Sequence, residues 1–146
     1  MQVVVITDDA GAVVEAGWLA RAEAVHRQLR PQLPADYSDK MRRVFAGGGR
    51  MIVATEAANV VGVAVYRIYQ DTFNGIKCYV DDLVTDEQRR SSGVGHALID
   101  WLAAAARRAG CGGLSLDSGT QRTQAHQFYF REEFVITSFN FRRTFK

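Results

Sequence analysis

Cysteine and proline are scarce in this chain, with two of each in 146 residues. The cysteines, Cys78 and Cys111, match no metal-ligand spacing, so we expect no metal site. The N-terminal segment turns acidic at Asp8, too soon for an export signal. We therefore expect both cysteines to be reduced thiols in a cytoplasmic protein.

Long apolar runs, repeats, low-complexity tracts and long linkers are also missing. No apolar run is long enough to span a membrane, so we expect no membrane partner. The net charge of +2 is small and the arginines are scattered, which argues against nucleic acid as a partner. With 47% hydrophobic and 23% charged residues, the sequence predicts one globular domain over residues 1–146.

The first third of the chain predicts a short strand over 3–6 and two helices. Apolar residues recur at helical spacing from Val14 to Leu29, and Pro31 and Pro34 follow this helix. A second helix is predicted over 36–45, ending at the glycines of 47–49.

The period then changes to that of a sheet. β-Branched and aromatic residues predict strands over 51–55, 60–69 and 76–85, joined by turns, as an antiparallel meander. A helix from Gly93 to Arg108, a strand over 113–118, a helix over 123–132 and closing strands over 134–136 and 139–145 follow. The helix after 76–85 carries the chain back, so that crossover should be parallel. The order is β-α-α-β-β-β-α-β-α-β, an α+β fold with a mixed, mostly antiparallel sheet flanked by helices.

A glycine turn precedes the predicted helix at residue 93. The segment runs Arg89-Arg90-Ser91-Ser92-Gly93-Val94-Gly95-His96. The first N–H groups of a helix lack internal partners and attract anions, and glycines let a ligand approach the backbone. The segment therefore suits a diphosphate, although a plain strand-to-helix turn would also need glycine. It lacks the Gly-Lys-Ser/Thr of a Walker loop, and Leu98 stands where a dinucleotide fingerprint needs Gly or Ala. The third nucleotide that such a turn could bind is coenzyme A.

The sequence resembles the GNAT family of acetyl-CoA-dependent N-acetyltransferases. Arg90-Ser91-Ser92-Gly93-Val94-Gly95 matches the signature Gln/Arg-x-x-Gly-x-Gly/Ala of that family, Val80–Thr85 is similar to its fourth strand, and Ala125-His126-Gln127-Phe128-Tyr129 is similar to its late helix. One departure is Glu133, where the family often has glycine.

The resemblance implies acetyl-CoA as co-substrate and assigns the residues that bind it. The diphosphate would contact Arg90, Ser91, Ser92, Gly93, Val94, Gly95 and His96, with Arg122 as a further phosphate or substrate contact. Backbone N–H groups of Leu83, Val84 and Thr85 would bind the thioester carbonyl. For His96 and Arg122 a plain exposed position is an equal alternative, and Leu83–Thr85 could be ordinary strand residues.

Proton transfer needs an acid and a base. A primary amine with a pKa of about 10.4 must lose a proton before it attacks, and a carboxylate can accept it. Asp81 is the preferred candidate and Asp82 the second, and as neighbours on a strand only one is expected to face the substrate. The resemblance places Tyr129 near the thioester sulfur as general acid. Salt bridges for the aspartates and a core position for Tyr129 are the alternatives.

The acceptor is left open between small-molecule and peptide amines. The resemblance implies an acceptor site built from the first two helices and the turn at 69–76. Five acids in or near this region would suit a cationic amine: Asp9, Glu15, Asp36, Asp39 and Asp71. The alternative is that they are acids scattered on the surface. Two alternatives to N-acetyl transfer are a non-catalytic acyl-CoA sensor and transfer of a longer acyl group. The Phe-rich terminal strand could pair between subunits, giving a homodimer.

Overall fold

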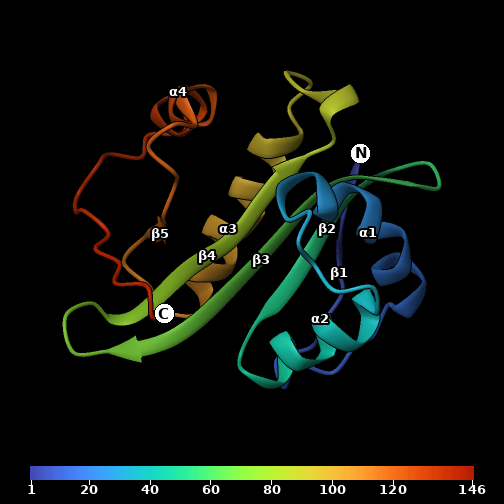
Figure 1. Cartoon of the computed structure of the whole chain (residues 1–146), viewed down its shortest axis with the longest axis horizontal. Helices are drawn as coiled ribbons and strands as arrows, with labels where there is room; N and C mark the ends of the chain where they lie inside the picture. The colour runs from blue at the N-terminus through green and yellow to red at the C-terminus, as the bar shows by residue number, and fades with distance from the viewer. The chain divides into compact units, whose positions relative to one another are not determined.

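The computed structural model describes all 146 residues, which form two compact units, Met1–Ser115 and Leu116–Lys146. Figure 1 labels the elements of both units. The first unit holds β1 (Gln2–Val5), α1 (Ala16–Leu29), α2 (Tyr37–Ala46), β2 (Arg50–Glu56), β3 (Asn59–Asp71), β4 (Gly75–Thr85), the 3-10 turn η1 (Glu87–Arg89) and α3 (Val94–Arg108). The short strand β5 (Leu114–Leu116) crosses the boundary, and α4 (Thr123–Arg131) lies in the second unit.

The sheet follows chain order, β1-β2-β3-β4-β5, and its first three pairings are antiparallel. The long β3–β4 hairpin runs from the pair Gly62–Thr85 to the pair Asp71–Gly75. Its register shifts between Val65 and Tyr66, which face Asp82 and Val80. Asp81 is thus the extra residue of a β-bulge. The predicted meander is confirmed, and the bulge determines which side chains share a face.

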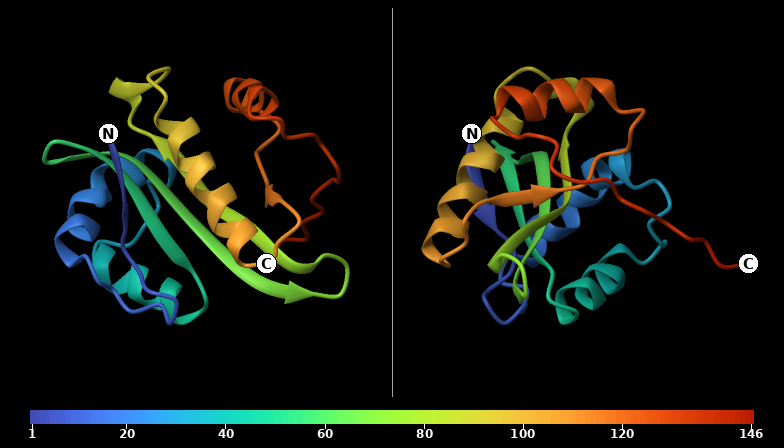
Figure 2. Two further views of the ribbon diagram at one scale, coloured as in Figure 1. Left: turned by 180° about the vertical axis from the view of Figure 1, so that it is seen from behind. Right: turned by 90° about the vertical axis from the view of Figure 1, so that its left-hand side faces the viewer.

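In the first unit, helices cover both faces of the sheet. Figure 2 shows α1 and α2 on one face and α3 on the other. Side chains alternate along a strand, so Val63 and Val65 join the main core with Leu19 and Phe45 of the first two helices. On the opposite face, the ring of Tyr66 contacts an aromatic ring of α3 at 5.9 Å between centroids. The site residues of β4 are thereby held between two packed layers.

Local capping explains where the helices begin and end. The Asp36 side chain accepts a hydrogen bond from the Asp39 N–H at 3.0 Å and starts α2. Gly110, with φ of +85°, follows the end of α3, where a left-handed residue is favoured. No helix combines the length and the apolar character needed to cross a membrane.

The predicted closing strands are wrong. Residues 134–136 and 139–145 carry no strand. The alternating phenylalanines Phe139, Phe141 and Phe145 are 83%, 92% and 87% exposed. Alternating phenylalanines favour a strand, because aromatic side chains pack well on a sheet. A strand also needs a neighbouring edge with free backbone N–H and C=O groups.

Candidate active site

The bulge in β4 brings two carboxylates to one cavity. In the strand register Asp82 is paired with Val65, whereas Asp81 is paired with no residue of β3. Because an extra residue interrupts the alternation of the strand, both side chains line the same cavity, which lies on the α1–α2 side of the sheet. The expectation that the two neighbouring side chains point to opposite faces of the strand is therefore wrong.

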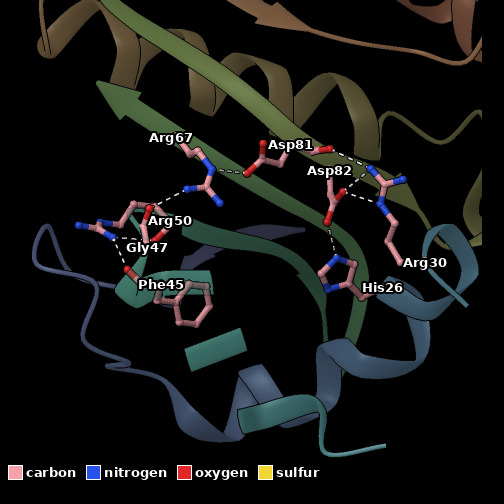
Figure 3. Close-up of polar contacts among 9 residues, drawn as sticks. His26, Arg30, Phe45, Gly47, Arg50, Arg67, Asp81 and Asp82 are labelled. Atoms are coloured by element: carbon pink, nitrogen blue, oxygen red, sulfur yellow. Dashed lines mark hydrogen bonds and ion pairs between the residues drawn. The ribbon is translucent and has the colours of Figure 1, made fainter. Parts of the chain in front are cut away.

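Asp82 is held from α1 by two cationic or hydrogen-bonding groups (Figure 3). His26 Nε2 lies 2.7 Å from Asp82 Oδ2, and Arg30 Nε donates to Oδ1 at 2.7 Å. Burial raises the pKa of the Asp82 carboxyl, but the hydrogen bonds and charges of His26 and Arg30 outweigh this, and the net pKa lies below its usual range. Asp82 is therefore ionised at neutral pH and is a weak proton acceptor.

His26 joins this carboxylate to α2. Its ring is 1% exposed, and Nδ1 lies 2.8 Å from the hydroxyl of Tyr37, itself buried. Burial is the main cause that raises the pKa of Tyr37, with Glu23 and Asp82 adding to it, so the phenol stays protonated. Since Asp82 is ionised, His26 Nε2 must carry the hydrogen that it donates. The chain Tyr37–His26–Asp82–Arg30 fixes α1 against β4.

Asp81 has a different set of partners. Arg67 Nε donates to Asp81 Oδ2 at 2.7 Å, and Arg67 Nη1 donates to the Gly47 carbonyl at the end of α2 at 2.8 Å (Figure 3). The Arg67 guanidinium thus bridges the bulge and a helix C-terminus, where a cation is favoured. The Asp81 side chain is 29% exposed, against 14% for Asp82, so Asp81 is the carboxylate more accessible from the cavity.

The cavity between these groups has a volume of about 400 Å³. It is lined by His26, Arg30, Gln32, Leu33, Pro34, Lys40, Met41, Val44, Val65, Arg67, Asp81 and Asp82. None of the five acids expected near the acceptor is among them. Asp36 caps α2, Asp39 pairs with Arg43, and Asp71 caps the turn at Phe73 and Asn74. Asp36, Asp39 and Asp71 therefore serve local structure, and Asp9 and Glu15 do not line the cavity.

The glycine turn follows β4 and is tied to α1. Gln28 donates to Asp86 Oδ1 at 3.2 Å and accepts from the Glu87 N–H at 2.9 Å. Arg89 pairs with Glu56, whereas its neighbour Arg90 is exposed and has no ion pair. Of the two adjacent arginines, Arg90 is the one available to an anion.

The backbone of the turn opens toward solvent at the start of α3. Ser91 and Gly93 have positive φ values of +62° and +86°. No side chain caps α3 and its first turn holds no acid. A Cβ added to Gly93 would meet nothing within 4 Å, so open space lies in front of the helix N-terminus. The Ser92 hydroxyl donates to the Arg89 carbonyl and shapes the turn itself. These features fit an anionic group such as a diphosphate.

Another glycine lets α3 approach the sheet. A Cβ on Gly62 of β3 would lie 2.5 Å from Val94 Cγ1 and 3.0 Å from Leu98 Cδ1. The first turn of α3 therefore packs directly on the backbone of β3. This contact fixes the turn relative to the end of β4, where Leu83, Val84 and Thr85 pair with Ala64, Val63 and Gly62.

The far edge of β4 is only partly paired. β5 has three residues against eleven in β4, so it can bond to no more than a part of that edge. Alternate N–H groups of a strand point to opposite edges. The segment Leu83–Thr85 therefore has backbone donors directed to the side away from β3.

Tyr129 and Arg122 lie in the second unit, and we describe them within it. Tyr129 is 9% exposed, and its ring contacts those of Phe128 and Phe134 at 5.5 and 5.6 Å. Burial raises its pKa, while the charge and hydrogen bond of Arg122 pull it down by less. The hydroxyl is thus protonated at neutral pH. Glu133 adopts φ of +66°, so the turn after α4 keeps the left-handed backbone that glycine would adopt without strain.

The other singled-out residues have structural partners. His96 and Asp100 form an exposed i,i+4 pair at 3.2 Å. His126 Nε2 bonds to the Gly119 carbonyl at 2.8 Å. Cys78 is buried, and burial, followed by the charge of Cys111, raises its thiol pKa to about 12.

The four basic residues of the cavity were not predicted from the sequence as site residues: His26, Arg30, Lys40 and Arg67. The available signal for His26 was a polar residue four positions after Ala22, on the buried stripe of α1.

Comparisons with known proteins show the family to which the chain belongs. Residues 21–134 match the acetyltransferase (GNAT) family. An N-acetyltransferase called YhdJ from Bacillus subtilis (strain 168), described as uncharacterized, is 44% identical over 70 residues, which is 47% of this chain and 49% of that protein. The chain thus matches about half the length of that relative.

Solved structures share the fold across almost the whole chain. AAC(6')-Iy in complex with a bisubstrate analog, CoA-S-monomethyl-acetylneamine, has a TM-score of 0.79 at 16% identity, covering 99% of this chain and 97% of that one. The aminoglycoside acetyltransferase meta-AAC0020 from an uncultured soil metagenomic sample, in complex with trehalose, has a TM-score of 0.80 at 13% identity, with 99% and 96% covered. At these identities the likeness concerns the fold alone. The family match covers residues 21–134, which is most of the chain, and the chain therefore belongs to the acetyltransferase (GNAT) family.

Proposed function

We propose that the protein is an N-acetyltransferase that moves an acetyl group from acetyl-CoA to a primary amine by direct attack on the thioester. The observation that carries this proposal is the open turn at the start of α3, which lies at the end of the strand that holds Asp81 and Asp82. A donor bound at the turn and an acceptor in the cavity would then meet along β4. The name of the YhdJ relative and the CoA analog bound by AAC(6')-Iy support the same chemistry.

For the donor, the turn supplies backbone and charge. The N–H groups of Val94, Gly95 and His96 precede the first helical bond, which Ala97 N–H makes to the Gly93 carbonyl at 3.0 Å. These three groups would bind the diphosphate with Arg90 and the Ser91 hydroxyl. Ser92 shapes the turn around it. In the second unit, Arg122 is exposed and is a further candidate for a phosphate contact.

For the acceptor, Asp81 is the group proposed to take the proton, directly or through water. Its second carboxylate oxygen makes no protein hydrogen bond, whereas both oxygens of Asp82 are engaged and its pKa is low. Asp82 therefore positions Arg30 and His26. Both aspartates face the cavity, so an amine there lies within the reach of Asp81.

The reaction then needs three events at the thioester. Backbone N–H groups of Leu83–Thr85 hydrogen-bond to the carbonyl oxygen and stabilise the negative charge that develops on it. The amine nitrogen forms a bond to the carbonyl carbon as the carbon–sulfur bond breaks, and Asp81 collects the proton lost by the amine. We propose Tyr129, whose hydroxyl is protonated at neutral pH, as the group that gives a proton to the departing thiolate and regains one from solvent.

A thiol-release assay with acetyl-CoA and a broad panel of small-molecule and peptide amines tests this proposal. We expect release with at least one amine. Acetyl-CoA binding without release from any amine would instead support a non-catalytic acyl-CoA sensor, and faster release from succinyl-CoA would support a longer acyl group.

The donor site has its own test in Gly93→Val. This side chain would enter the space before α3, so acetyl-CoA binding measured by calorimetry should be abolished while the protein stays folded. Gly75→Val is a matched control, because Gly75 has φ of +78° and equally open surroundings but lies at the β3–β4 turn. Equal affinity in Gly93→Val and the control would refute the assignment of the turn.

A further inference from the structure

The cavity on the α1–α2 side of β4 carries more positive than negative charge. Its cationic side chains are Arg30, Lys40 and Arg67, and its carboxylates are Asp81 and Asp82. His26 also lines the cavity, and its Nε2 lies 2.7 Å from Asp82 Oδ2, so it adds no negative charge. If this cavity receives the acceptor, as the proposed function requires, its charge bears on which amines can enter.

The carboxylates of the cavity are largely neutralised from within. Asp82 Oδ1 accepts from Arg30 Nε at 2.7 Å and Oδ2 accepts from His26 at 2.7 Å. Asp81 Oδ2 accepts from Arg67 Nε at 2.7 Å. Only Asp81 Oδ1 is left outside these bonds, so the cavity offers a single carboxylate oxygen to an incoming amine.

The donors, in contrast, are only partly used. Arg30 makes its bonds through Nε and Nη2, and Arg67 through Nε and Nη1, which leaves one terminal nitrogen of each guanidinium outside them. Lys40 of α2 lines the cavity and takes part in none of the ion pairs of the structure. One free acceptor beside several free donors is the complement of a molecule with one amine and one anionic group.

We propose that the acceptor is a primary amine that also carries a carboxylate, as an amino acid does. The amine would lie at Asp81 Oδ1, and the carboxylate would be bound by Lys40 with the free guanidinium nitrogens of Arg30 and Arg67. A molecule with several ammonium groups, such as an aminoglycoside, meets too few free carboxylates here and is repelled by Lys40. The preference therefore differs from that stated in the name of the aminoglycoside acetyltransferase that shares the fold.

The test compares amines that differ only in a carboxylate. The pairs are β-alanine with ethylamine, γ-aminobutyrate with propylamine, and L-lysine with cadaverine, and neamine and spermidine serve as polycations. Thiol release from acetyl-CoA, catalysed by the 146-residue chain, gives kcat/KM for each amine. We expect the carboxylated member to exceed its partner by about tenfold or more in at least one pair, as one charge-assisted contact would provide.

Lys40→Glu and its matched control isolate the local charge. Lys40→Glu should lower the ratio of kcat/KM within that pair by about tenfold or more. Arg42→Glu makes the same change in net charge on the same helix, but Arg42 is exposed and does not line the cavity, so its ratio should stay within about twofold of the wild type. Thermal unfolding of both variants confirms that they are folded.

Three results would overturn this inference. Higher kcat/KM for polycations than for every carboxylated amine would refute the substrate class while leaving N-acetyl transfer intact. Equal effects of Lys40→Glu and Arg42→Glu would show that Lys40 does not contact the acceptor. Absence of thiol release from any amine, of either class, would refute the proposed function and with it the inference that rests on it.

Discussion

The close approach of α3 to the sheet predicts a large effect from a single added methyl group at Gly62. In Gly62→Ala the new Cβ would lie 2.5 Å from Val94 Cγ1, inside the closest separation that carbon atoms normally adopt, and 3.0 Å from Leu98 Cδ1. Val94 is β-branched and 1% exposed, so it has little freedom to move away. The first turn of α3 must therefore shift outward, or the core beneath it must rearrange.

The expected magnitude is the balance of two effects. Overpacking of this kind costs about 1–3 kcal/mol of the free energy of unfolding. Replacing glycine by alanine in a strand would by itself raise the free energy of unfolding by about 0.5–1 kcal/mol, because alanine lowers the backbone entropy of the unfolded chain. The difference lies between about 0 and 2.5 kcal/mol, and the 2.5 Å contact places this variant in the upper part of that range, at a net loss of about 1–2 kcal/mol. Because α3 carries the donor turn, we also expect weaker acetyl-CoA binding.

Urea unfolding and calorimetry with acetyl-CoA measure the two effects. Val94→Ala removes the methyl group that the new Cβ would meet. The double variant Gly62→Ala/Val94→Ala should therefore be more stable than the sum of the single effects predicts, by about 1 kcal/mol. Gly112→Ala is the control, since a Cβ there meets nothing within 4 Å. Full stability of Gly62→Ala, or strict additivity in the double variant, would refute the idea that this contact sets the position of α3.

Two further predictions concern titrating groups. Asp82 has a folded-state pKa below its unfolded value of about 3.9, so its contribution to stability is present above that pH and is lost as the pH falls through the folded-state value. The difference in unfolding free energy between wild type and Asp82→Asn should thus be full at neutral pH and shrink in acid, as urea unfolding at several pH values would show; a difference that stays constant into acid would contradict the assigned ion pairs. Tyr129→Phe should lower kcat by about tenfold or more without changing the affinity for acetyl-CoA, because it keeps the ring contacts and removes only the proton donor. Full turnover of this variant at every pH would exclude Tyr129 as the general acid.

The elements that the sequence predicted well are those with local causes. The second helix was expected over 36–45 and is observed as Tyr37–Ala46, with Asp36 as its cap. The hairpin turns and the end of α3 at Gly110 likewise depend on residues a few positions apart. The turn after α4 is a mixed case. Glu133 departs from the expected glycine, yet the backbone keeps its left-handed form because α4 and Phe134 hold both sides of it, with a Phe134 N–H to Tyr129 carbonyl bond at 2.9 Å.

The features that escaped prediction depend on distant partners. The Asp81 bulge exists because β3 and β4 differ by one residue between their paired ends, and nothing in the letters around Asp81 shows this. His26 looks like any residue of an amphipathic helix until Asp82, 56 positions later, is placed against it. The terminal phenylalanines show the converse, because a clear alternating pattern forms no strand where no neighbouring edge pairs with it.

The bulge also explains how two adjacent carboxylates can serve different purposes under the proposed function. In a regular strand Asp81 and Asp82 would face opposite layers, and the layer that holds α1 would have one acid to anchor Arg30 and to accept a proton. Such a residue would be poorly suited to proton transfer, because the ion pairs that anchor Arg30 lower its pKa. With both acids on one face, Asp82 takes the anchoring contacts and Asp81 keeps an oxygen for the amine. One extra residue in β4 thus assigns the anchoring of Arg30 and proton transfer to two different carboxylates. It does so just before Leu83–Thr85, whose backbone N–H groups are proposed to bind the thioester carbonyl.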